Sequence, residues 1–174
     1  MTSQDLIQTV CTVLCKTLTP SQAEEILAAT RPRSVPAGSI VFREGEEGSG
    51  LFLLLKGSVE VVKQGPNGPS QQLATVDAPS VLGEMSLVSE RRHSATVRAT
   101  TDAEFRVLAR ENFLRLLERD NLAALKLLGA IAEVLARRLR RMNDMAMELL
   151  GRSDTPPMEE MARFKQKLFS EWSF

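Results

Sequence analysis

The chain has 174 residues, with 22 Lys and Arg against 22 Asp and Glu, so its formal net charge at neutral pH is zero. This length and a hydrophobic content of 43% predict one domain whose core needs neither a metal nor a disulfide to fold. The even charge disfavours nonspecific nucleic-acid binding, and one histidine with two cysteines argues against a zinc site or a metal-dependent jelly-roll enzyme.

Residues 1–35 are predicted to form a helical segment, because their apolar residues recur at spacings of three and four. A break at Pro20 comes before a second helical piece over 21–29. For this piece Ser21 is the expected N-cap, and Glu24 is the expected partner in a capping box.

The cysteines and the start of the chain indicate the cellular compartment. Cys11 and Cys15 are too few for a disulfide framework, and we interpret them as small core residues, with a thiol switch as the alternative. No basic run precedes the apolar residues, as it does in a signal peptide, and no apolar run is long enough to span a membrane. The sequence therefore predicts a cytoplasmic protein without membrane contact.

Residues 36–110 are predicted to form a β-roll. Prolines and Gly38 stop helicity, and 64–69 is expected to be a hairpin tip. A closed or sandwiched roll of about eight strands is the economical packing for so many short strands. The apolar runs, each bounded by turn-forming or charged residues, lie at 40–42, 51–55, 59–62, 73–76, 95–97 and 105–108.

Residues 111–150 are predicted to form a long dimerisation helix with a break near Asp120. Part of it has the alternating spacing of a coiled-coil seam, which predicts a homodimer through residues 125–149, and a merely amphipathic surface helix is the alternative. A second set of apolar residues, Leu127, Ile131 and Val134, is left to pack on the roll. The seam consists of Leu125, Leu128, Ala132, Leu135, Leu139, Met142, Ala146 and Leu149.

Residues 151–174 are predicted to be a linker and an amphipathic C-terminal helix. The helix is expected to dock on its own domain or on the dimer mate, or else to bind a partner protein. Its apolar face consists of Met158, Met161, Phe164, Leu168 and Trp172.

The segment 82–97 carries the residues that indicate a ligand. Gly83 and Glu84 open a short helical turn that basic residues follow, which is an arrangement suited to an anion. Glu84 is a possible acceptor for a ribose hydroxyl, whereas a phosphate needs a cation from Arg91, Arg92 or His93 and a hydroxyl from Ser86 or Ser94. In the other interpretation Glu84 pairs with an arginine and Gly83 only turns the chain.

Three stretches resemble the cyclic nucleotide-binding domain of catabolite activator protein, kinase regulatory subunits and nucleotide-gated channels. They are Pro36 to Gly48, Leu53 to Val61, and Gly83 to Leu87 followed by 94–97. The resemblance implies a mainly β fold, an eight-stranded β-roll flanked by helices. It also implies that the cassette glutamate holds the ribose hydroxyl, that backbone amides hold the cyclic phosphate, and that the following helix closes over the base. The implied ligand-binding residues are Gly83, Glu84, Met85, Ser86, Arg92, His93, Ser94 and Ala95.

The sequence departs from the family where the cassette has its phosphate-binding arginine, because His93 stands at that position. Arg92 is one residue earlier, and it reaches the phosphate only if a bulge absorbs the shift. Losing a charge-assisted pair costs about 1.5–3 kcal/mol, which is roughly tenfold to more than a hundredfold in affinity. Protonated His93 is a further candidate for the missing charge at low pH.

The function predicted from these features is a stand-alone regulatory module, not an enzyme, that senses cyclic AMP or cyclic GMP and has no other cofactor and no metal. Because only residues 151–174 follow the long helix, we expect no DNA-binding domain and expect the signal to pass to an unidentified protein partner. The alternative is a degenerate roll that no longer binds nucleotide and serves as a dimeric scaffold.

Overall fold

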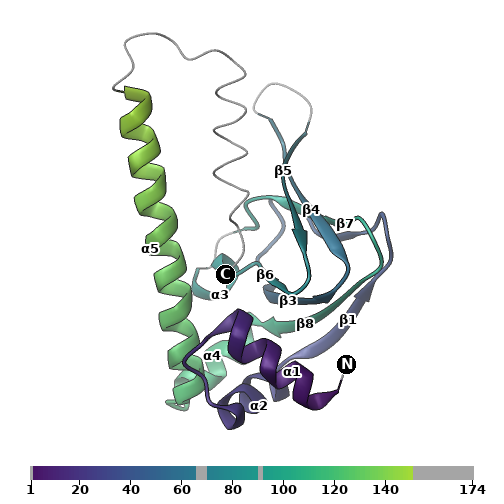
Figure 1. Cartoon of the computed structure of the whole chain (residues 1–174), viewed down its shortest axis with the longest axis vertical. Helices are drawn as coiled ribbons and strands as arrows, with labels where there is room; N and C mark the ends of the chain where they lie inside the picture. The colour runs from purple at the N-terminus through teal and green to yellow at the C-terminus, as the bar shows by residue number, and fades with distance from the viewer. Residues whose placement is uncertain (1, 66–69, 90–91, 151–174) are drawn as a thin grey trace.

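A computed structural model of the chain describes residues 2–65, 70–89 and 92–150. Its eight described strands form two four-stranded antiparallel sheets, which confirms the β-roll (Figure 1). The first sheet contains, in spatial order, β1 (Arg31–Val35), β8 (Ala103–Ala109), β3 (Gly50–Lys56) and β6 (Ser80–Leu82). The second contains β2 (Ile40–Phe42), β7 (Thr96–Ala99), β4 (Ser58–Lys63) and β5 (Gln71–Asp77).

Strand β3 is buried on both faces of its sheet. Because side chains alternate along a strand, Phe52 and Leu54 point into the core between the sheets, whereas Leu51 and Leu53 contact the helical layer outside. The roll therefore has two hydrophobic cores separated by the thickness of one sheet.

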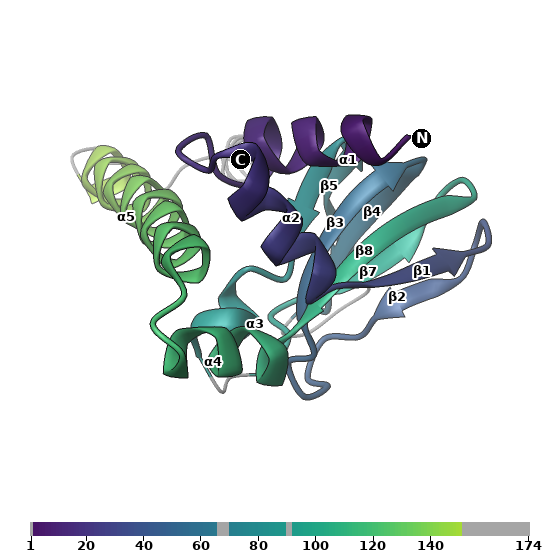
Figure 2. The same cartoon turned by 90° about the horizontal axis from the view of Figure 1, so that it is seen from below.

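The helical layer consists of helices that precede and follow the strands, together with α3 from between β6 and β7 (Figure 2). These are α1 (Ser3–Thr9), the π-helical turn η1 (Val10–Leu14), α2 (Pro20–Ala28), α3 (Met85–Val88), α4 (Arg110–Glu118) and α5 (Leu122–Leu150). Their apolar side chains and those on the outer face of the first sheet form one cluster that includes Ile26, Phe113 and Ile131.

The cap of α2 differs from the prediction. Thr19, not Ser21, is the N-cap, because Pro20 occupies the first helical position, where its missing N–H costs nothing. The Thr19 hydroxyl accepts from the Gln22 amide at 3.3 Å, and the Gln22 side chain accepts from the Thr19 amide at 3.1 Å. The capping box is therefore formed by Thr19 and Gln22 instead of Ser21 and Glu24.

The roll begins earlier than predicted, and the long helical segment is divided at the expected break. The roll begins before residue 36, since 31–35 forms β1, and Pro32 is tolerated there because β1 is an edge strand. The segment 111–150 is not one helix: α4 and α5 are separated at Asp120, whose φ is 52°, and the Asn121 side chain accepts from the Ala124 amide at 3.0 Å. The expected break thus lies where the sequence placed it.

Helix α5 has one buried face over residues 123–134. Leu127, Ile131 and Val134, the set predicted to pack on the roll, are buried, and the neighbours of α5 include the helices α2 and α4. Of the predicted seam, Leu125 and Leu139 are 46% and 59% exposed, whereas Leu128 and Leu135 are half-buried and pack against the helical core. The predicted terminal helix and the residues 66–69 of the predicted hairpin tip lie outside the described residues, and no described helix is long and apolar enough to cross a membrane.

Candidate ligand-binding site

The turn that leads from β6 into α3 requires glycine at position 83. Gly83 has a φ of 74°, and a Cβ there would lie 2.6 Å from the Gly50 carbonyl oxygen of β3. The turn is closed by two backbone hydrogen bonds, from Ser86 N to Gly83 O and from Leu87 N to Glu84 O. These contacts hold α3 close to the first sheet and place its first residues at the edge of a cavity.

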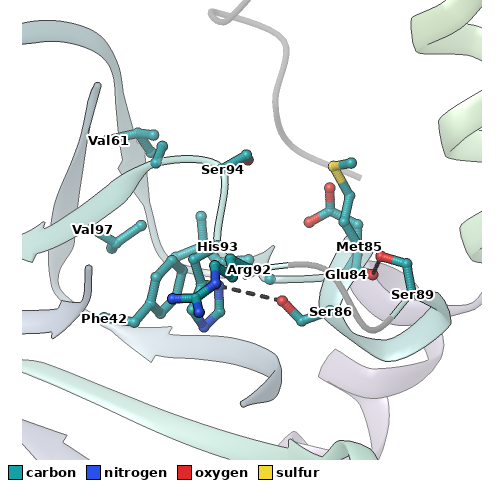
Figure 3. Close-up of a pocket in the computed structure, with 13 residues that line it drawn as sticks. Phe42, Val61, Glu84, Met85, Ser86, Ser89, Arg92, His93, Ser94 and Val97 are labelled. Atoms are coloured by element: carbon teal, nitrogen blue, oxygen red, sulfur yellow. Dashed lines mark hydrogen bonds between the residues drawn. The ribbon is translucent and has the colours of Figure 1, made fainter. Parts of the chain in front are cut away.

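A cavity of about 260 Å³ lies between α3, the segment 92–95 and the inner face of the roll. All eight residues that the sequence nominated for the ligand line it. Figure 3 shows apolar residues of the roll on one side of the cavity and residues of α3 on the other. The further lining residues are Phe42, Val61, Leu82, Ser89 and Val97.

His93 belongs to the wall of the cavity. Its side chain is buried, with 5% of the residue exposed, and its ring stacks on Phe42 with 3.9 Å between the centroids. The Ser49 amide donates to Nε2 at 3.3 Å, so Nε2 is an acceptor, and Nδ1 lies 3.3 Å from the Ser86 hydroxyl. Burial lowers the pKa of His93, and this effect is larger than the opposing effect of Glu46. A neutral ring with both nitrogens engaged is poorly suited to the cation role considered for His93.

Arg92 is exposed and lines the cavity. Its Nη1 donates to the Gly45 carbonyl oxygen at 2.7 Å, which holds the side chain along the 43–46 turn. The neighbouring residues at positions 92 and 93 thus have opposite environments, one in solvent and one in the wall. Among the described residues that line the cavity, Arg92 is the one that carries a guanidinium.

Glu84 is the most deeply buried charged residue of the site, with 2% of it exposed. Its Oε1 accepts a hydrogen bond from Nη1 of Arg138, which lies 54 residues later on α5. The structure therefore contains the pairing of Glu84 with an arginine that the sequence left open as the alternative. The sequence pattern assigns Arg138 to the solvated flank of a coiled coil and not to the site, although it continues the inward face of α5 after Ile131 and Val134.

The polar end of the cavity is fixed from the second sheet. Nζ of Lys63 on β4 donates to the Ser94 carbonyl oxygen at 2.7 Å and lies 3.4 Å from the Glu44 carboxylate. The Thr96 hydroxyl accepts from the Glu44 amide at 3.0 Å. The segment that carries Ser94 and Ala95 is thereby held against the roll.

The model of the cyclic nucleotide-binding domain family matches residues 32–120. The chain belongs to this family. A relative of this cyclic nucleotide-binding domain, the cyclic AMP receptor protein of Thermus thermophilus, is 35% identical over 134 residues, which cover 77% of this chain and 60% of the relative. The cAMP-dependent protein kinase regulatory subunit of Aspergillus niger is 32% identical over 104 residues, which cover 60% of this chain and 25% of the relative.

Solved structures agree with this assignment. The crystal structure of a cyclic nucleotide-binding domain from Methylobacillus flagellatus superposes with a TM-score of 0.72 at 25% identity, covering 84% of this chain and 83% of that one. This cyclic nucleotide-binding domain therefore spans nearly all of a solved domain, whereas it spans 60% or less of the length of the two curated relatives.

Proposed function

We propose that this domain is a regulatory module that binds cyclic AMP in the cavity between α3 and the roll. The observation that carries the proposal is the convergence of a carboxylate, Glu84, and a guanidinium, Arg92, on one cavity with an apolar wall. A cyclic nucleotide has the matching groups, namely a ribose hydroxyl, a singly charged phosphate and an apolar base. The name of the Thermus relative, a cyclic AMP receptor protein, supports cyclic AMP as the first ligand to test.

Arg92 takes the role of phosphate partner in this proposal. His93 is neutral and held by Ser49 and Ser86, so it offers no charge to a phosphate, whereas Arg92 is at the cavity and reaches solvent. To bind a phosphate, Arg92 has only to exchange its hydrogen bond with the Gly45 carbonyl oxygen for a stronger charge-assisted one.

Calorimetric titration with cyclic AMP, cyclic GMP and 5′-AMP tests the proposal. Arg92→Gln should weaken the binding of the cyclic nucleotide by roughly tenfold to a hundredfold, because a hydrogen bond to a charged group contributes about 1.5–3 kcal/mol. Arg31→Gln, which removes an exposed arginine of β1, is the matched control and should leave the affinity unchanged.

Thermal unfolding with millimolar nucleotide gives an independent readout, since a ligand at about a hundred times its Kd adds about 2.7 kcal/mol of stability. No binding by any of the three nucleotides would favour the scaffold function, for which the Glu84–Arg138 pair is the supporting observation.

We also propose that the module is a homodimer through α5. The support is the exposed apolar stripe on the face turned away from the roll, which includes Leu122, Leu125 and Leu139. Light scattering after size exclusion should give a dimer for the wild type and a monomer for Leu139→Glu, whereas Glu133→Gln, at an exposed position of the same helix, should stay dimeric. A monomeric wild type would leave the stripe available to the protein partner through which we expect the signal to pass.

A further inference from the structure

Arg138 occupies a position of α5 where the pattern calls for an apolar residue. The buried residues Leu127, Ile131 and Val134 follow one another at spacings of four and three, and the next position on that face is 138. Arg138 is 24% exposed at its side chain, while the flanking Arg137 is exposed. The inward face of α5 therefore ends in a charged group that pairs with Glu84, a residue lining the cavity.

The partner of Arg138 is the carboxylate that the proposed ligand needs. Nη1 of Arg138 donates to Oε1 of Glu84, and Glu84 is 2% exposed. A carboxylate this deeply buried is stable only when it is paired, and a guanidinium is a stronger partner than a neutral hydroxyl. A ribose hydroxyl approaching Glu84 thus meets an acceptor that is already engaged by a better donor.

We propose that Arg138 is an internal competitor of the ligand, a latch that ties α5 to α3 and that nucleotide binding has to release. The inference rests on the proposed function and adds the residue that sets its affinity. Because the latch spans the cassette and α5, the free energy used to release it couples ligand binding to the position of the C-terminal half of α5. Nucleotide affinity is lower, and the response of α5 larger, than they would be without the arginine.

The test compares Arg138→Gln with Arg137→Gln, which removes the same charge from an exposed neighbouring position. Calorimetric titration with cyclic AMP should show Arg138→Gln binding about tenfold to a hundredfold more tightly than the wild type, which corresponds to about 1.4–2.8 kcal/mol. Arg137→Gln should bind like the wild type. Circular dichroism and the double variant Glu84→Gln with Arg138→Gln, which leaves no buried charge behind, check that the fold is retained.

A second ligand, 2′-deoxy cyclic AMP, isolates the group for which the arginine competes. This analogue lacks the hydroxyl that needs Glu84, so Arg138→Gln should change its affinity by less than twofold. Equal tightening of both ligands would mean that the arginine acts by general charge or by blocking the cavity, and would refute the competition for Glu84.

A readout without nucleotide tests the tie itself. Amide hydrogen exchange over residues 134–141 should be faster in Arg138→Gln than in the wild type or Arg137→Gln, because the hydrogen bond that joins α5 to Glu84 is lost. An affinity that Arg138→Gln leaves unchanged would refute the latch alone. An affinity that it weakens would refute the latch and would assign Arg138 to ligand support. Absence of cyclic AMP binding in the wild type and in every variant would refute the proposed function and the latch together.

Discussion

Acidification from pH 7.5 to 5.5 should lower the free energy of unfolding by at most about 1.4 kcal/mol, and His93→Gln should remove most of this loss. Burial lowers the pKa of His93 in the folded protein below its ordinary value of about 6.5, and Glu46 opposes the shift only in part. The unfolded chain therefore takes up a proton in this range before the folded protein does. Stability contributed by the neutral ring is fully present above about pH 6.5 and is lost as the pH falls below it.

The size of this loss follows from the binding of one proton to the His93 ring. The limit of about 1.4 kcal/mol applies when the folded ring stays neutral throughout, because the unfolded ring is then about ten parts protonated to one at pH 5.5. The structure supports a loss of this sign, since protonating Nε2 would oppose the Ser49 amide, which also donates to that atom. Ordinary carboxyl groups titrate near pH 4 and contribute little over this range.

Urea denaturation followed by circular dichroism at half-unit pH steps measures the effect. His93 is the single histidine of the chain, so no other imidazole contributes. His93→Gln retains an acceptor for the Ser49 amide, and its stability is compared with its own value at pH 7.5, so that the lost stacking on Phe42 cancels. A wild-type stability that does not change over this range, or an equal loss in both proteins, would refute the neutral, buried state of His93.

Three further changes test the packing around the site. Gly83→Ala should lower the free energy of unfolding by about 2–4 kcal/mol, because the backbone there is left-handed and a Cβ would meet the Gly50 carbonyl oxygen. The control Gly129→Ala, a helical position with nothing within 4 Å of the added Cβ, should raise it by up to about 1 kcal/mol in the same urea titration. Asn121→Ala should lower the free energy of unfolding by about 1 kcal/mol in thermal unfolding, since it removes the cap of α5 and a hydrogen bond of 2.6 Å to Glu25. The control Asn143→Ala, at an exposed helical position, should leave it almost unchanged. Phe113→Ala should cost about 3–5 kcal/mol by the same method, because the ring is fully buried, and a loss below 1 kcal/mol would contradict its place in the helical core.

The strands that the sequence predicted are those whose apolar runs are bounded by turn residues. The run 40–42 coincides with β2, and the runs at 51–55, 59–62 and 105–108 lie within β3, β4 and β8. Strand β1 was missed because its proline argues against a strand unless the sheet order is known. Strand β6 was missed because three residues beginning with Ser80 carry no periodicity.

The residues that line the cavity could be predicted from the sequence, but the charge state and the partners of its side chains could not. Spacing and resemblance selected eight residues that do meet around one cavity, because the turn at Gly83 and the segment 92–95 are local features. The state of His93 depends on Phe42 and Ser49, which lie some 40 to 50 residues earlier and carry no sign of their role. Arg138 belongs to a run of four arginines within 137–141, and only the buried positions of α5 single it out.

Helix α3 is a single turn with one side in the cavity wall and the other in the helical core. Ser86 faces His93 in the cavity wall, while Leu87, the next residue, is part of the helical core with Phe113. A close-packed interior does not deform gradually, so α3 cannot yield to a guest by a large fraction of an ångström while Leu87 stays in place. A guest that displaced α3 would therefore have to repack Leu87 and the helices around it.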